Sequence, residues 1–309
     1  MVEMVLNGVS TRKVSKVVET LCGTSYSKST VSELCKELDQ KVKEFRTRPI
    51  TGEYPFLTID ATYFKARENH RIISKAFMIA YATDDQGHRE ILGFGVYANE
   101  SKETWKSFIR DLKARGLRNV LMITSDAHEG LCDAISKEFP QAAWQRCQFH
   151  FSKNIAEKAP KKYQAGIRSE LSEMFNCITI EEARRKRDSI IADYQEVAES
   201  AMTCLDEGFE SSMTAMILPK YLRQYFRTSN HIERINREPK RRSKVIGRCS
   251  QRSLHTQTDG LCSDGTKLMQ LRQEKSCSAR KHTTKADVNR SERNKLIILA
   301  NEQQLLRVS

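Results

Sequence analysis

Three acidic residues stand in sequence settings where a carboxylate can do chemistry. Asp60 lies in the apolar run LTIDATY, where burying a carboxylate is costly unless it is paired or binds a cation. Asp126 ends the apolar run NVLMITSD, and Glu233 lies in the polar segment RTSNHIERINREPKRR. If the three meet, their hard oxygen atoms suit Mg²⁺, which keeps several waters for substrate phosphates. By its position alone, Glu233 could also be an ordinary surface residue. Its assignment to a site therefore depends on the presence of Asp60 and Asp126.

The elements that must position these acids can be predicted from the hydrophobic pattern. Three runs rich in β-branched and aromatic residues, YPFLTIDATYF, ISKAFMIAYATD and REILGFGVYA, predict an antiparallel meander with short turns. An amphipathic helix from Lys102 to Arg115 follows, and NVLMITSD then predicts a strand buried on both faces. HEGLCDAISKEF is typical of a second helix, and AAWQRCQFHF of a fifth strand.

This order of elements is the connectivity of the ribonuclease-H-like α/β fold with a mixed sheet. In that fold the middle of the first strand lies beside the C-terminal end of the fourth, so we expect Asp60 and Asp126 to converge. We assign residues 54–151 to the first part of this core. Residues 152–227 show a helical pattern throughout and predict an all-helical insertion, and residues 228–247 predict the core helix that carries Glu233.

Residues 1–48 predict two short helices. The apolar positions fall on one stripe of each, and Thr30 with Glu33 forms a capping-box pattern at the start of the second. The pair resembles a helix-turn-helix, whose second helix can enter a DNA major groove. A helical hairpin that only packs against the rest of the protein has the same pattern. We expect a linker around Arg46, Arg48 and Pro49.

The charge and cysteine content narrow the class of protein. Lys and Arg number 52 against 39 acids, a formal net charge of +13, which favours a polyanionic partner. The nine cysteines include no C-x-x-C pair, which argues against a disulfide scaffold and for a reducing compartment. No stretch approaches 18 apolar residues and no signal-peptide pattern is present, so we expect an intracellular protein without membrane contact.

Further polar residues accompany the three acids. Cys147 and His150 form C-x-x-H, which is half of a zinc site, but no second pair follows at suitable spacing. A core cysteine and a buried, hydrogen-bonded histidine are the ordinary interpretation. His128 follows Asp126 by two positions and could assist it, or could cap the next helix.

A basic cluster surrounds and follows Glu233. We predict that its side chains bind the DNA backbone, because they flank the third acid. A run of basic residues that is only exposed to solvent, or a localisation signal, has the same composition. The cluster comprises Arg234, Arg237, Lys240, Arg241, Arg242 and Lys244.

Four collinear segments carry a resemblance to a known family. They are GVSTRKVSKVVETLCGTSYSKSTVSELCKELD, SDAHEGL, WQRCQFHFSKNI and TSNHIERINRE with KRRSKVIG. From about Leu6 to Gly247 the chain resembles the mutator-type transposases of bacterial insertion sequences. The resemblance implies an acidic triad at Asp60, Asp126 and Glu233. The family's Cys/Asp-x-x-His motif falls on Cys147 and His150, which implies that His150 lies near the active site and contacts the scissile phosphate or orients a carboxylate.

The resemblance also implies a mechanism and partners. The activity would be cleavage at terminal inverted repeats followed by strand transfer into target DNA, with two Mg²⁺ or Mn²⁺ ions. Asp60 would bridge the two ions, and Asp126 and Glu233 would each complete one site. Double-stranded DNA would be the partner, and pairing of DNA ends implies a homodimer or larger assembly. The location would be the bacterial cytoplasm, at the nucleoid.

The chain departs from the family pattern at both ends. Relatives carry further helices before the N-terminal region and Leu-rich helices after the segment KVIG, where residues 248–309 here are polar and basic. We expect a chain truncated at the front and frameshifted near Arg248, with a low-order tail. Two alternatives follow: an inactive remnant that only binds DNA, or another nuclease of this fold such as a resolvase, against which the helical insertion and the context of Glu233 weigh.

Overall fold

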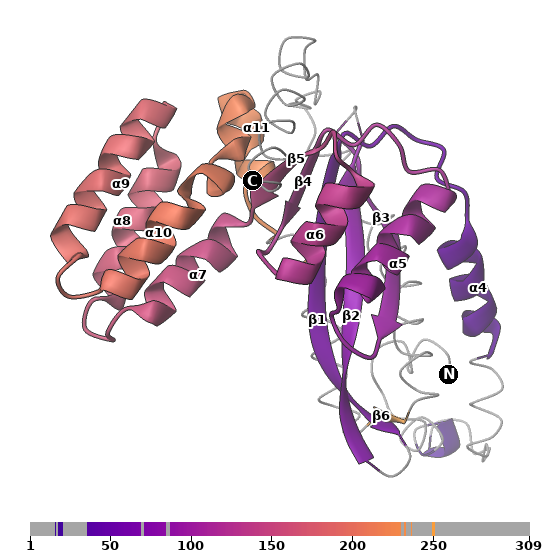
Figure 1. Ribbon diagram of the computed structural model, residues 1–309. Coiled ribbons are helices and arrows are strands. Elements are labelled where there is room, and N and C mark those ends of the chain that lie inside the picture. The colour runs from indigo at the N-terminus through magenta and orange to yellow at the C-terminus, as the bar shows by residue number, and fades with distance from the viewer. Residues whose placement is uncertain are drawn as a thin grey trace.

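A mixed β-sheet forms the centre of the computed structural model, which describes residues 16, 18–20, 36–68, 71–84, 87–229, 232, 236 and 249–250 (Figure 1). The strand order is β3-β2-β1-β4-β5. The strands are β1 (Phe56–Glu68), β2 (Arg71–Thr83), β3 (Arg89–Tyr97), β4 (Met122–Ser125) and β5 (Ala143–Arg146), and the two-residue β6 (Cys249–Ser250) pairs with the far end of β1. The sheet is compatible with the ribonuclease-H-like fold expected from the sequence.

The antiparallel and the parallel strand pairings both agree with the prediction. β1, β2 and β3 form the antiparallel meander, while β4 pairs parallel to β1 and β5 pairs parallel to β4. β1 and β2 are each 13 residues long and extend beyond the short β4 and β5. The carboxyl ends of β4 and β5 therefore lie beside the middle of β1.

Two helices, α5 (Lys102–Ala114) and α6 (Glu129–Glu138), cover one face of the sheet (Figure 1). α5 starts at a capping box in which Ser101 and Thr104 bond each other's backbone N–H groups, and its buried stripe includes Trp105, which is fully buried. Trp105 is therefore a core residue, and Trp144 packs against the same core.

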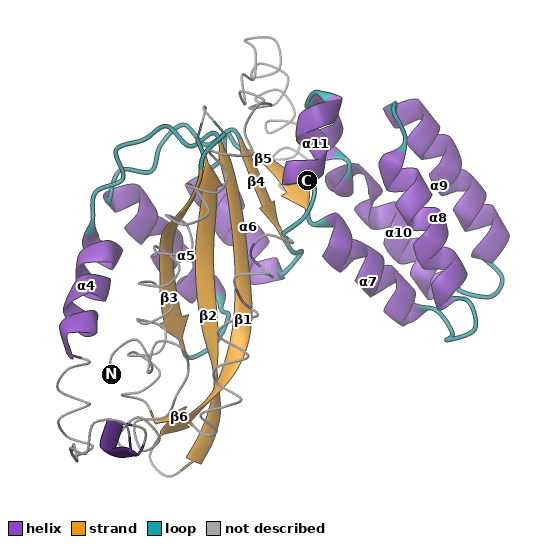
Figure 2. Cartoon of the chain, turned by 180° about the vertical axis from the view of Figure 1, so that it is seen from behind, coloured by secondary structure: helices purple, strands orange, loops and turns teal. Residues whose placement is uncertain are grey.

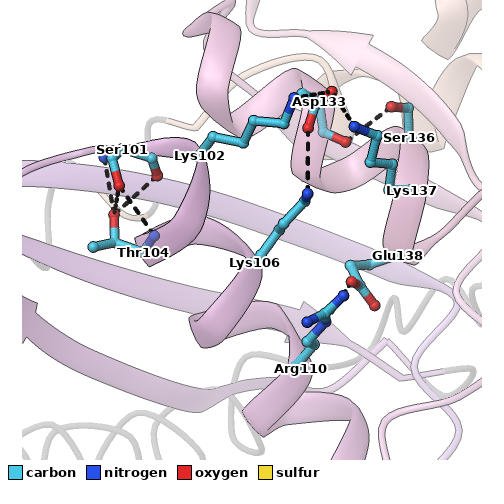
Figure 3. A network of polar contacts seen from close by, with 9 residues as sticks. All are labelled: Ser101, Lys102, Thr104, Lys106, Arg110, Asp133, Ser136, Lys137 and Glu138. Carbon is cyan, nitrogen blue, oxygen red and sulfur yellow. Dashed lines mark hydrogen bonds and ion pairs between the residues drawn. The ribbon is translucent and has the colours of Figure 1, made fainter.

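Charged side chains link α5 to α6 at the surface (Figure 3). Arg110 Nε donates to Glu138 at 2.7 Å, and Lys102 Nζ lies 3.0 Å from Asp133. Pairs of this kind at an exposed position each stabilise a protein by about 0–1 kcal/mol. The packing of the two helices therefore depends mainly on the apolar core beneath them.

The opposite face carries a second apolar layer. Val42 of α4 (Lys36–Thr47), Phe64, Phe77 and Phe94 of the sheet, and Ile232 pack together there. The helix α4 runs through Arg46, where the sequence predicted a linker, because its apolar side chains Val42 and Phe45 pack on this layer. Most of the predicted helix-turn-helix lies outside the described residues.

Residues after β5 are helical, and the fifth strand is shorter than predicted. It ends at Arg146, and QFHF, assigned to this strand from the sequence, forms the first turn of a helix. The apolar residues Phe151 and Ile155 are spaced by four and are both buried, as one face of a helix requires. The helices are α7 (Gln148–Lys158), α8 (Gln164–Asn176), α9 (Ile180–Tyr194), α10 (Glu199–Ser212), the 3₁₀ helix η1 (Thr214–Ile217) and α11 (Lys220–Phe226).

Helices α7 to α10 share an apolar core of their own, beside the sheet (Figure 2). The chain then returns to the sheet, where Phe226 of α11 stacks on Phe56 of β1 at 3.9 Å between ring centroids. Beyond α11, Ile232 packs in the apolar layer on the sheet. None of the helices that the structure describes has the length and apolarity needed to span a membrane.

The separate core of the helical block predicts a contrast between two isoleucines. Ile167 of α8 is fully buried in it, whereas Ile178 is 58% exposed. Ile167→Ala should destabilise the protein by about 2–5 kcal/mol through lost burial and a residual cavity. Ile178→Ala should stay within about 0.5 kcal/mol of the parent. Urea unfolding measures both, and equal effects would show that the block has no packed core.

Candidate active site

Asp60 lies in the middle of β1 and is 6% exposed. Its register partner on β2 is Ile79, which belongs to the apolar layer beneath α4. Because side chains alternate across a strand, Asp60 lies on that face and not on the face covered by α5 and α6. A carboxylate is thus held against an apolar layer, as its sequence setting indicated.

The parallel register aligns Asp126 with Asp60. Thr58 of β1 pairs with Thr124 of β4, and continuing that alignment by two residues sets Asp126 beside Asp60 on the same face. The register of β4 with β5 extends in the same way. Ser125 pairs with Arg146, so the residues that follow them, Asp126 and Cys147, are also aligned. The Cys147 N–H donates to the Ser125 carbonyl at 2.7 Å. Continued past the ends of β4 and β5, this register points to a row of Asp60, Asp126 and Cys147.

Local hydrogen bonds fix the loop that carries Asp126. Its Oδ1 accepts the backbone N–H of His128 at 3.3 Å, and Ser125 Oγ donates to its carbonyl at 2.8 Å. Trp144 Nε1 in turn donates to Ser125 Oγ at 2.9 Å. His128 stands at the N-cap of α6, as one of the two alternatives from the sequence has it, but its side chain makes no capping hydrogen bond.

Cys147 and His150 interact at the start of α7. Cys147 is fully buried, and Ser229 approaches its sulfur with both backbone N–H and hydroxyl, each at 3.3 Å. Burial opposes ionisation of the thiol, but the hydrogen bond and charge of His150 outweigh it and lower the pKa of Cys147. Cys147 is thus buried, whereas His150, which hydrogen-bonds to it, is only half-buried.

The same pair makes His150 a cation at neutral pH. Its hydrogen bond to Cys147 raises the pKa of His150 to about 9 against the opposing effect of burial, and the charges of Cys147, Asp60 and Asp126 contribute further. Both aspartates are therefore close enough to act electrostatically on this imidazole. The charges of both acids thus act on His150, which stands in the first turn of α7, directly after β5.

Asn236 also reaches this site. Its Nδ2 donates to Asp60 Oδ2 at 3.0 Å, and the side chain is buried. Sequence reasoning missed Asn236, because an asparagine in a polar helical segment looks like a surface residue. The only usable signal was its spacing of four from Ile232, which places both on one helical face.

Glu100 is a second residue that the sequence did not single out. It lies between β3 and α5, and burial first, then the charge of Asp126, raises the pKa of its carboxyl. A hydrogen bond from Tyr63 works in the opposite direction. An acid in a short turn carries no sequence signal of its own, because only the fold brings it near Asp126.

Several predicted site residues lie outside the described part of the chain. They are Glu233 and the whole basic cluster, Arg234, Arg237, Lys240, Arg241, Arg242 and Lys244. Within the described ranges, no group of three or more His, Cys, Asp or Glu side chains is arranged to hold a metal ion. Asp60 and Asp126 supply hard oxygen donors on one face, a donor set that suits Mg²⁺ or Mn²⁺ rather than zinc.

The chain is similar to known proteins of one family. A family model described as "Transposase, Mutator family" matches residues 1–255. The transposase for insertion sequence element IS256 in transposon Tn4001 of Staphylococcus aureus is 40% identical over 285 residues, covering 91% of this chain and 72% of the relative.

With two other relatives, the similar region spans a smaller share of the relative's length. The transposase for insertion sequence element IS1081 of Mycobacterium tuberculosis is 38% identical over 250 residues, 78% of this chain and 59% of that protein. The transposase for ISRM5 of Rhizobium meliloti is 35% identical over 244 residues, 79% of this chain and 61% of that protein. The chain belongs to the Mutator family of transposases, enzymes that cleave DNA and transfer its strands.

Proposed function

We propose that this transposase cleaves the terminal inverted repeats of its element and joins the ends to target DNA at a metal site formed by Asp60, Asp126 and Glu233. The observation that carries the proposal is the parallel register of β1 and β4, which pairs Thr58 with Thr124 and, continued by two residues, brings Asp126 beside Asp60. Two carboxylates on one face, one of them buried, are costly unless a cation compensates their charge.

Glu233 completes the proposed set from a third segment. Ile232 and Asn236 are both helical, and Asn236 contacts Asp60. Glu233 itself lies outside the described residues, and its proposed place in the set rests on its position between these two residues in the sequence. Bound divalent ions would activate a water or 3′-hydroxyl nucleophile and stabilise the leaving oxygen.

The chain's own residues supply the electrostatics around such a site. His150 carries a positive charge near both aspartates, where it can donate a hydrogen bond to a phosphate oxygen of the scissile DNA. Cys147 keeps the imidazole charged and oriented, and Ser229 holds the cysteine sulfur. His150 is thus proposed to bind and orient the phosphate and not to act as a base.

The remaining parts are proposed to bind DNA. The basic cluster around Glu233 would neutralise backbone phosphates, and the N-terminal helices would read the terminal repeats. The block from α7 to α11 is proposed to be the helical insertion of a ribonuclease-H-like core. Synapsis of two DNA ends would require at least a dimer, acting in the bacterial cytoplasm at the nucleoid.

Neutralising any one acid should abolish cleavage while leaving DNA binding in place. We expect Asp60→Asn, Asp126→Asn and Glu233→Gln each to slow Mg²⁺- or Mn²⁺-dependent cleavage of a terminal-repeat duplex by at least about 1,000-fold, because metal stabilisation is worth several kcal/mol. Affinity for the uncleaved duplex, measured by fluorescence anisotropy, should change little because phosphate contacts dominate it.

Asp193→Asn is the matched control, since Asp193 is an exposed aspartate on α9 far from the site in sequence. It should cleave like the parent. If the parent binds the duplex but does not cleave it with either metal, the chain is a DNA-binding remnant. If Asp60→Asn cleaves normally, the proposed site is wrong.

The charge on His150 can be measured directly. NMR titration of the imidazole should give a pKa near 9, and Cys147→Ala should lower it toward the ordinary range of about 6.5, because the hydrogen bond that favours the charged ring is lost. The other histidine signals give internal references. A His150 titration that Cys147→Ala leaves unchanged would contradict the pairing.

A further inference from the structure

Asn236 is joined to Asp60 by a buried hydrogen bond between segments 176 residues apart in sequence. Asn236 is 3% exposed and Asp60 is 6% exposed. An amide that donates to a carboxylate in such surroundings gives a charge-assisted bond, which is stronger than a neutral one. The bond occupies Oδ2 of Asp60 and so constrains the direction in which the carboxylate presents its other oxygen.

The other end of the Asn236 amide is unsatisfied. Its Oδ1 is buried and accepts no hydrogen bond from the described residues. Thr62 Oγ1 is likewise buried without a hydrogen-bond partner among the described residues. Thr62 lies two residues from Asp60 on the same face of β1. Leaving a buried polar atom without a partner costs about 1–3 kcal/mol, so an unpartnered oxygen on the very side chain that bonds Asp60 points to a further group bound beside Asp60.

We propose that Asn236 is a positioning residue for the metal-binding carboxylate of Asp60. Its Nδ2 fixes one carboxylate oxygen, and its Oδ1 accepts a hydrogen bond from a water molecule of the occupied site. This inference rests on the proposed function, since it assigns Asn236 to the same metal site. Outer-shell partners of this kind orient metal ligands and tune metal affinity.

A purely structural role for Asn236 makes a different prediction. Ile232 stands one helical turn earlier, is fully buried and packs in the apolar layer with Phe64 and Phe77. If Asn236 only anchored this segment to the sheet, substituting it would lower stability and spare metal affinity, as substituting Ile232 should. A positioning residue should instead change metal affinity out of proportion to stability.

The test is Mn²⁺ binding to the DNA-free protein, measured by calorimetry, together with thermal unfolding of the metal-free protein. Asn236→Ala and Asn236→Leu both remove the donor, and only the second keeps the side-chain volume. Each should weaken Mn²⁺ binding by about 10–100-fold. The Mn²⁺ concentration that half-activates cleavage should rise to match, with a much smaller change in the rate at saturating metal.

Ile232→Ala is the matched control on the same helical face. It should lower the unfolding midpoint and leave Mn²⁺ affinity within about twofold of the parent, as expected for a cavity that spares the ligands. If the two Asn236 variants behave like Ile232→Ala, the positioning role is overturned while the metal site stands. If Asp60→Asn leaves Mn²⁺ binding intact, the proposed function itself fails.

Discussion

The structure depends on one constraint, which is that Asp60 carries a carboxylate into a buried position in the middle of β1. An isolated ionised carboxylate in an apolar layer costs several kcal/mol, so the surroundings must compensate it. The surrounding chain supplies part of this compensation through the Asn236 amide and the charged imidazole of His150. The neighbouring Asp126 adds charge of the same sign, and this makes a bound cation the natural completion of the site.

The fold brings these groups together by strand register and by one return of the chain. Two short parallel strands end beside the middle of the long β1, which sets Asp126 and then Cys147 in line with Asp60. After the helical block the chain comes back over the sheet, where Thr124 Oγ1 donates to the Phe226 carbonyl at 2.6 Å. Ser229 and Asn236 reach Cys147 and Asp60 from this returning segment.

The sequence predicted the strands and their order, because alternating apolar patterns and parallel register are local and general rules. The convergence of Asp60 with Asp126 is a proposal that continues this register. The sequence also identified Cys147 and His150 as a pair. It missed Asn236 and Glu100, since a polar residue in a helix or turn acquires its role only through contacts far apart in the chain. The end of β5 was misplaced because QFHF suits a strand by composition, whereas burial of Phe151 and Ile155 on one helical face decides its conformation.

The central claim is that Asp60 and Asp126 bind the same divalent cation. Crystals of the protein grown with Mn²⁺ and a terminal-repeat duplex, with diffraction recorded at the manganese edge, test it most directly. If Asp60 and Asp126 share the cation, an anomalous peak will be coordinated by carboxylate oxygens of both aspartates. A peak elsewhere on the protein, or one that contacts neither Asp60 nor Asp126, would contradict it.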